Sequence, residues 1–242
     1  MKCLALRLAF LVLAGSQAMA AADIPRLPDG SPDMSGVWMG SGSSSADIRT
    51  SLKPGEQLVL LPWAEAKMKT LKSQDDPQAN CMPSGVPRSS PYPWRMVQAS
   101  SHEKPSLIFM LFEGNIHSYR QIFMDGGEHP PSDELVNTWF GHSIGKWEGD
   151  TLVVDSVGFN DKFWFDYLVH PHTEQLHIVE RYTRSAFDKM DIEVTIDDPG
   201  AYAKPFTTRG SAELLEGEDL LEYICNENNI DLEHIDAPAQ LP

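Results

Sequence analysis

The chain has 242 residues, of which 41% are hydrophobic and 22% are charged, a composition typical of a soluble globular protein. Its 35 acidic residues against 19 basic ones give a net charge of −16. This charge disfavours nucleic acid or an anionic membrane surface as a partner, because phosphate groups bind to clustered lysine and arginine. The length suits one domain of a large β type or two small domains.

The N-terminus has the pattern of a secretory signal peptide over residues 1–20. A basic start precedes a short apolar run at residues 8–15, and Ala18-Met19-Ala20 offers a cleavage site. The run is too short to span a bilayer, so a membrane anchor is the less favoured alternative and no membrane insertion is expected. We expect cleavage after Ala20 or Ala22 and a mature protein that is periplasmic or secreted.

The first third of the mature chain contains the only segment with helical periodicity. Residues 21–34 are rich in proline and aspartate and are expected to form an extended arm, with a first strand at 34–39. A helix is predicted at 61–72, where Pro62 suits the first turn. So many prolines and glycines follow at 74–93 that regular structure is excluded there, and this segment could form a wall over a site.

From Trp94 onward the chain has the pattern of β-strands. Residues 190–197 show it most clearly, because apolar side chains alternate with aspartate, glutamate and threonine. Tight turns are predicted at Gly114-Asn115 and at residues 148–150. Together with the first strand, ten strands are expected, the others at 106–113, 116–125, 135–140, 143–147, 151–159, 174–184, 190–197, 206–214 and 220–225.

Consecutive strands with short turns and one helix predict a closed barrel or a sandwich. Several strands carry polar residues on both faces, which favours a barrel whose interior is a ligand cavity. The predicted fold is therefore mainly β, an antiparallel β-barrel of about ten strands with one short helix. It is expected to occupy residues 35–228 as a single domain and to be followed by an acidic tail at 229–242.

Removal of the signal peptide would leave two cysteines, Cys81 and Cys225. In an exported chain such a pair predicts one disulfide, which would tie the first third of the chain to its last strand. Two free buried thiols are the alternative. Metal ligation by the pair is disfavoured, because neither cysteine has a second cysteine or a histidine at ligand spacing.

Residues 141–145 read G-H-S-I-G and match the nucleophile elbow of α/β-hydrolases. That elbow requires a buried strand before the serine and a helix after it. The residues that follow, 146–150, predict a hairpin instead, and no alternating α/β pattern surrounds the motif. We interpret the motif as a turn that needs two glycines.

Histidines and carboxylates are the stronger candidates for chemistry. A neutral histidine or a buried carboxylate can transfer a proton on a ring or carbonyl substrate, and phenolic or cationic groups can stabilise a developing oxyanion. Charged pairs between strands and turn caps are the structural alternative for the carboxylates. The predicted catalytic residues are His172, His177, Glu180, Tyr119, Arg120 and Asp125.

A second set of residues is predicted to bind the substrate. Aromatic residues are dense in this part of the chain, and the run Phe163-Trp164-Phe165 lies in a polar-flanked loop where it could stack on a planar ligand. Histidine-based metal binding is a weaker alternative, since the strands contain no close pair of histidine ligands, and no metal is predicted. The predicted substrate-binding residues are Arg88, His129, His142, Trp139, Trp164, Phe165 and Tyr182.

Two resemblances extend these predictions. Gly36-Val37-Trp38 resembles the Gly-x-Trp motif in the first strand of the lipocalin superfamily. Nearly the whole mature chain resembles a large set of uncharacterised exported bacterial proteins, which implies an exported, barrel-like domain, supports the cysteine pair and brings no activity with it. The motifs that carry this likeness are SGVW (35–38), CMPSGVPR (81–88), YRQIFMDGGEHP (119–130), GHSIGKWEGDTLVVDSVGF (141–159), HIVERYTR (177–184), DDPGAYAKPF (197–206) and EYICNEN (222–228).

Three functions are compatible with the sequence. The first is an exported enzyme that carries out cofactor-free acid–base chemistry, of lyase, isomerase or hydrolase type, on a small apolar or cyclic organic molecule in a barrel cavity. No glycine-rich nucleotide loop is present, so no nicotinamide, flavin or nucleotide cofactor is expected. The second is a lipocalin-like carrier of a hydrophobic ligand in the periplasm, and the third is a structural or envelope-associated protein. A histidine and a carboxylate within hydrogen-bond reach at one cavity would favour the enzyme.

Overall fold

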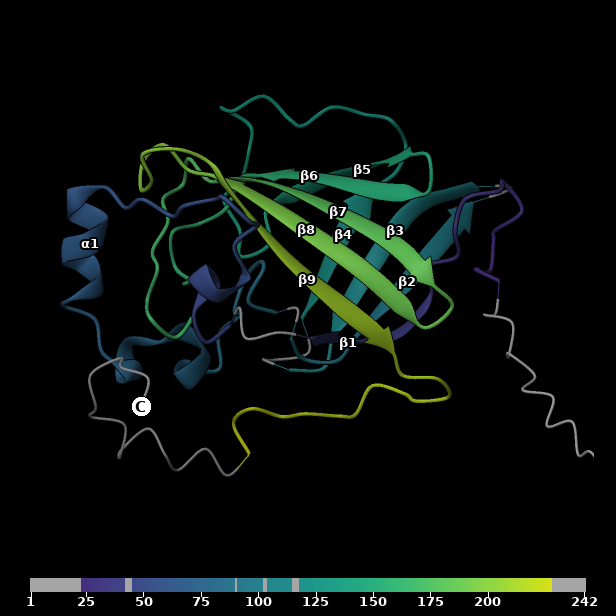
Figure 1. Ribbon diagram of the computed structural model, residues 1–242, viewed down its shortest axis with the longest axis horizontal. Helices are drawn as coiled ribbons and strands as arrows, with labels where there is room; N and C mark the ends of the chain where they lie inside the picture. Colours follow the sequence, from purple (N-terminus) through teal and green to yellow (C-terminus); the bar gives the residue numbers. More distant parts are fainter. Residues whose placement is uncertain (1–22, 42–44, 90, 102–103, 115–117, 228–242) are drawn as a thin grey trace, which may run out of the picture.

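The computed structural model describes residues 23–41, 45–89, 91–101, 104–114 and 118–227. The expected signal peptide, the acidic tail at 229–242 and Asn115 of one expected turn lie outside these residues. Within them the protein is mainly β, and nine strands close into a barrel (Figure 1). The strands are β1 (Gly36–Ser41), β2 (Trp94–Ser101), β3 (Lys104–Phe112), β4 (Tyr119–Phe123), β5 (His142–Glu148), β6 (Thr151–Val157), β7 (His177–Ala186), β8 (Lys189–Asp197) and β9 (Phe206–Leu214).

Each strand pairs with its neighbour in the chain, and β1 also pairs with β9 to close the barrel. The pairs are antiparallel except for β4 and β5, which run parallel and share two positions, Ile122 with Ser143 and Phe123 with Ile144. The expectation of a wholly antiparallel barrel is therefore wrong at this joint. A tight turn can join only antiparallel strands, so residues 124–141 carry the chain back along the barrel before β5 begins.

The predicted count of ten strands is also wrong. Residues 135–140 form no strand and make a single bridge, between Thr138 and Phe159. Residues 220–225 form no strand either, and their apolar side chains, including Leu221 and Tyr223, are exposed. Conversely, β2 is a full strand that was not predicted as a separate element.

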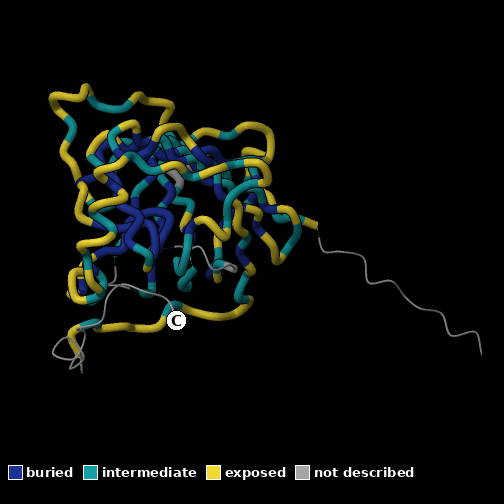
Figure 2. The backbone as a smooth tube through the Cα atoms, turned by 60° about the vertical axis from the view of Figure 1, so that its left-hand side comes forward, coloured by how far each residue is buried: buried dark blue, intermediate teal, exposed yellow. Residues whose placement is uncertain are grey.

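The barrel interior is filled mainly by apolar side chains, which alternate along the strands with outward polar ones. In β8, Met190, Ile192, Val194 and Ile196 are buried, whereas Asp191 and its alternating neighbours are not. Full burial of an aliphatic side chain of this size contributes about 1.5–3 kcal/mol. Figure 2 shows the resulting division between a buried interior and an exposed surface.

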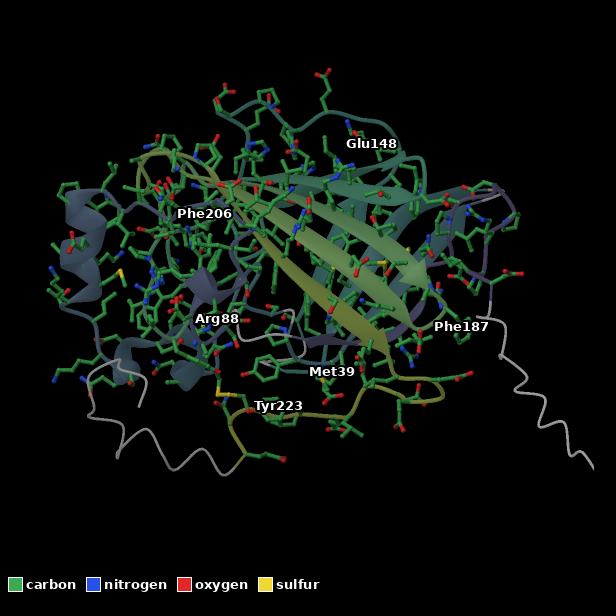
Figure 3. All side chains as sticks on the ribbon, viewed as in Figure 1. Met39, Arg88, Glu148, Phe187, Phe206 and Tyr223 are labelled. Carbon is green, nitrogen blue, oxygen red and sulfur yellow. A yellow bond between two sulfur atoms is a disulfide. The ribbon has the colours of Figure 1, made fainter. Side chains whose placement is uncertain are left out.

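Long connections cover one end of the barrel, and short hairpins close the other (Figure 1). The covered end holds α1 (Pro62–Met68), three 3-10 turns at Ile48–Ser51, Ser73–Asp75 and Pro77–Asn80, and the connections at 158–176 and 198–205. We call these elements the cap. Arg88 lies at the cap, while Glu148 and Phe187 lie at the hairpin end (Figure 3).

The helix α1 is shorter than predicted, although its first helical residue is Pro62 as expected. It buries only Ala64, and its neighbour Trp63 donates a hydrogen bond from Nε1 to the Gly200 carbonyl oxygen at 2.6 Å. No helix in the described part of the chain is long and apolar enough to cross a membrane.

The proline-rich segment at 74–93 is held firmly against the cap. Cys81 and Cys225 form the predicted disulfide. Arg88 is buried and donates to both carboxylate oxygens of Asp76, at 3.0 and 2.6 Å, while its guanidinium lies over the ring of Tyr167. The segment is therefore part of the cap, and the exclusion of regular structure at 74–93 is wrong at Pro77–Asn80, which form a 3-10 turn.

Candidate functional site

A groove of about 650 Å³ lies between β4 and the part of the β4–β5 connection that runs from residue 130 to residue 141. Its lining is largely aromatic and aliphatic, with contributions from Phe123, Leu135 and Phe140. Four of the residues predicted from the sequence line it, namely Tyr119, Arg120, Trp139 and His142. The groove thus brings together four of the thirteen predicted site residues.

Gly141 sets the position of His142 at the edge of this groove. Its φ of +65° belongs to the left-handed region, and a Cβ there would lie 2.5 Å from the Val157 carbonyl oxygen. The second glycine of the motif, Gly145, lies within β5, and residue 141 directly precedes this strand, so the interpretation of the motif as a turn is wrong. Only the left-handed φ of Gly141 requires a glycine. Ser143 between the two glycines is fully buried in β5, and the strand continues after it. In a hydrolase elbow the serine is followed by a helix instead.

A chain of hydrogen bonds connects His142 to a carboxylate. His142 and His129 approach through their Nδ1 atoms at 2.8 Å, and His129 Nε2 lies 3.1 Å from Asp155 Oδ1. The same carboxylate oxygen is 2.8 Å from Nε2 of His177. We name His142, His129, Asp155 and His177 the histidine chain.

The tautomers of His129 and His142 follow from the fact that the Asp155 carboxylate can only accept a hydrogen bond. A carboxylate accepts, so His129 carries its proton on Nε2 and offers Nδ1 as the acceptor for the Nδ1–H of His142. Nε2 of His142 is then left with its lone pair. Partial burial, and secondarily the nearby His129, lowers the pKa of His142, which keeps this nitrogen available as a base at neutral pH.

Strand register explains why these side chains meet. His142 pairs with Val157, which lies two residues from Asp155, and Asp155 pairs with Val179, which lies two residues from His177. Residues two apart on a strand share a face, so the three side chains stand together on the outer surface of the barrel. Asp155 was not predicted as a site residue, and only this register could have revealed it.

Inside the barrel, Arg120 also meets two further predicted residues, Glu180 and Tyr182. Arg120 Nη2 lies 2.5 Å from Glu180 Oε2, and the Tyr182 hydroxyl donates to Glu180 Oε1 at 2.6 Å. Arg120 also donates to the hydroxyl oxygens of Ser143 and Ser156, at 3.0 and 2.7 Å. All five side chains are buried. Burial, and secondarily the Glu180 carboxylate, raises the pKa of Tyr182, so its hydroxyl stays protonated as a donor.

His172, Trp164 and Phe165 lie in the interior of the cap and do not line the groove. His172 packs against Phe165 and against Phe163, whose ring centroid is 4.0 Å away, and its Nδ1 lies 3.2 Å from the Thr173 carbonyl oxygen. The run at 163–165 is therefore buried, although its polar flanks suggested a surface loop.

The buried His172 predicts a specific loss of stability in acid. Burial lowers its pKa to about 4, whereas in the unfolded chain its pKa would be near 6.5. The unfolded state then binds the proton more readily, so the free energy of unfolding should fall by roughly 3 kcal/mol as the pH drops from 6.5 to 4. Urea unfolding of His172→Leu against the parent protein at pH 7, 5.5 and 4 measures this. An equal slope for both proteins would contradict it.

Two predicted residues have local partners of a structural kind. Asp125 is exposed and accepts a hydrogen bond from the Gly127 amide at 3.0 Å, as a turn cap does. Arg88 is paired with Asp76 within the cap. Neither lines the groove.

Comparisons with known proteins leave the site to be interpreted on its own geometry. No family model, no curated protein and no solved structure matches this chain. The chemistry of the groove is therefore derived from its side chains alone.

Proposed function

We propose that the protein is an exported enzyme that carries out cofactor-free acid–base chemistry on a small apolar or cyclic organic molecule bound in the groove beside β4. The observation that carries this proposal is His142, which lines the groove and is connected through His129 to the Asp155 carboxylate. Export is supported by the Cys81–Cys225 disulfide, since such bonds persist in oxidising compartments, and by the likeness to exported bacterial proteins.

In this proposal Nε2 of His142 takes a proton from the substrate and later returns one. The resulting imidazolium is stabilised because His142 donates from Nδ1 to His129, which in turn donates to Asp155. Tyr119, 61% exposed and part of the groove, supplies a hydroxyl donor for an oxyanion that develops on the substrate. His129 and Asp155 are positioning residues, because they act through His142.

The apolar lining of the groove also supports a second candidate, a carrier of a hydrophobic ligand. Phe123, Leu135, Val136 and Phe140 offer contact area for such a ligand without any chemistry. The two candidates differ in what removal of His142 should do. A carrier would keep its affinity and show no turnover in either form, whereas an enzyme would lose turnover and keep its affinity.

Proton exchange with solvent provides the test. A panel of cyclic ketones and lactones is incubated with the protein in D₂O, and deuterium incorporation is followed by NMR. His142→Ala should slow exchange by a factor of about 10²–10⁴, and added imidazole should restore part of it. Asp155→Asn should change the pH dependence of the rate, as expected for a positioning residue.

Lys146→Ala is the matched control, since this exposed side chain lies on β5 as well but points to solvent and pairs with Glu148. It should leave the rate unchanged. Binding of panel members without exchange by the parent protein would exclude this acid–base chemistry and leave the carrier.

A further inference from the structure

A second hollow, of about 660 Å³, lies beneath α1 in the cap and shares no lining residue with the groove. Its walls are apolar and come from residues 58–60, from Met68 and Leu71, and from Leu168. Charged side chains, including Arg49, stand among them, and His170 is the one histidine of the lining. The hollow is large enough for a molecule of one or two rings.

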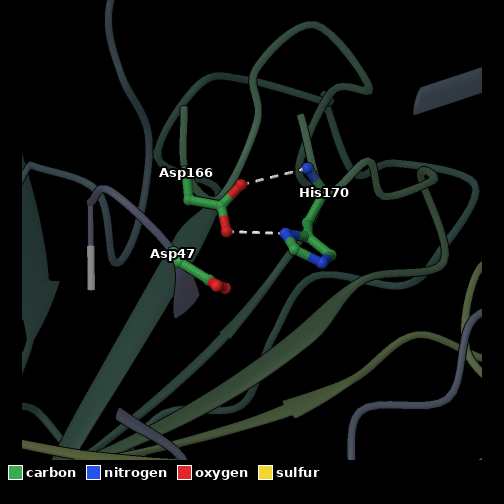
Figure 4. Close-up of side chains that lie close together, drawn as sticks. All are labelled: Asp47, Asp166 and His170. Carbon is green, nitrogen blue, oxygen red and sulfur yellow. Dashed lines mark hydrogen bonds and ion pairs between the residues drawn. The ribbon is translucent and has the colours of Figure 1, made fainter. Parts of the chain in front are cut away.

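His170 is held by a buried carboxylate. Its Nδ1 lies 2.6 Å from Asp166 Oδ2, and both side chains are at most 1% exposed (Figure 4). Asp166 also accepts the backbone N–H groups of Ile48 at 2.8 Å and of His170 at 3.2 Å. These bonds fix the imidazole and place its proton on Nδ1.

Nε2 of His170 is then a hydrogen-bond acceptor for which the described residues provide no donor. It is buried and has no partner among the residues that the structure describes. A buried polar atom without a partner is unfavourable and calls for a compensating ligand or function. His170 is not among the residues predicted from the sequence, although it lies two residues before the predicted His172.

The backbone beside His170 is strained. Val169 has a φ of +66°, which a β-branched residue rarely adopts. Hydrogen bonds from its own N–H to the Asp166 carbonyl oxygen and from Phe165 N–H to the His170 carbonyl oxygen hold it there. Strain of this kind persists where the surrounding structure enforces it, and it concentrates at ligand sites.

A metal ion is the less favoured occupant of this cluster, although Asp47, Asp166 and His170 bring three ligand atoms close together. Both carboxylate oxygens of Asp47 already accept from Arg49, at 2.8 and 2.9 Å. The nitrogen nearest Asp166 is Nδ1, and a metal there would leave Nε2–H as a buried donor without a second-shell partner.

We propose that the hollow beneath α1 is a second ligand site, which binds an apolar molecule through one hydroxyl group donated to Nε2 of His170. The tautomer of His170 demands a donor, and an ionised carboxylate has no proton to offer. The aliphatic walls accommodate the hydrocarbon body of an alcohol or a phenol. This inference does not depend on the function proposed for the groove.

Two probes of nearly equal shape test the hydroxyl requirement. p-Cresol can donate a hydrogen bond, whereas 4-methylanisole carries the same ring and oxygen without the proton. Titration calorimetry on the full, disulfide-bonded protein should show one p-cresol site, with 4-methylanisole bound about 3- to 10-fold more weakly. Equal affinity for the two probes would overturn the proposal.

Two variants locate the site. Val59 is 40% exposed at the wall of the hollow, so Val59→Trp should fill the space and abolish p-cresol binding without disturbing the buried cap. Asp166→Asn offers an amide donor to Nδ1 and moves the proton to Nε2, which should remove the preference for p-cresol. Circular dichroism and the melting temperature verify that both variants fold.

His142→Ala separates this site from the groove, because it should leave p-cresol affinity unchanged. Affinity that survives Val59→Trp would place the ligand elsewhere and overturn the proposal. Stoichiometric Zn²⁺ uptake that depends on His170 and Asp47, with no preference between the two probes, would overturn it in favour of a metal site.

Discussion

Replacement of Arg120 by methionine is expected to lower the free energy of unfolding by about 3–5 kcal/mol, because Glu180 would keep its buried carboxylate and lose the cation beside it. The guanidinium also donates to two buried serine hydroxyl oxygens. Ser156 would lose this donor, whereas Ser143 would keep the hydrogen bond from Ser156. Methionine keeps the apolar stem of arginine but lacks the guanidinium, so the loss combines the unpaired Glu180 charge with a smaller packing term. Guanidinium chloride unfolding at pH 7 measures it.

Two controls define the origin of this effect. Arg120→Met combined with Glu180→Leu removes both charges and should cost less than Arg120→Met alone, since no isolated charge remains. Arg209→Met breaks a surface ion pair of similar geometry, with Glu193 at 2.7 Å, and should cost at most about 1 kcal/mol. If Arg120→Met lowers the free energy of unfolding no more than Arg209→Met does, the expected cost of leaving the Glu180 carboxylate unpaired is contradicted.

Removal of the disulfide by Cys81→Ser with Cys225→Ser is expected to lower the free energy of unfolding by about 2–5 kcal/mol. The bond links residues 144 apart, so it removes many conformations from the unfolded chain. Thermal unfolding of the double variant, and of the parent protein with and without reductant, measures the effect.

The reduced parent protein should match the double variant, because both lack the same cross-link. If the double variant is as stable as the oxidised parent, residues 215–225 stay bound to the cap without the disulfide, and the prediction is wrong. Thiol titration of denatured parent protein should find neither Cys81 nor Cys225 free.

The strands that sequence analysis located best are those with one buried and one exposed face. The alternation in β8 and the tight turn at Gly149-Asp150 between β5 and β6 both appear in the structure. The strand predicted at 220–225 is absent, because the apolar residues there have side chains that face solvent. The parallel pairing of β4 with β5 had no local signal, since alternation is the same in both directions of pairing.

Several individual residues of the site could be predicted from the sequence, but their arrangement in space could not. The sequence predicts His129, His142 and His177 as site residues. Asp155, which contacts His129 and His177, depends on a strand register that composition does not reveal. The polar residues that flank 163–165 were interpreted as marks of a surface loop. In the structure Asp166 is buried, because its carboxylate satisfies backbone amides inside the cap.

Because β4 and β5 are parallel, the connection between them at 124–141 can change its length without changing the register of the barrel strands. A two-residue hairpin turn is restricted to a few backbone geometries. Residues 124–141 are free of that restriction, because they return along the barrel, and part of them forms one wall of the groove. Each doubling of such a loop costs only about 0.6 kcal/mol in closure entropy. Insertions and deletions in this connection can therefore reshape the groove while all nine strands keep their partners, which makes it the natural place to redirect ligand preference by engineering.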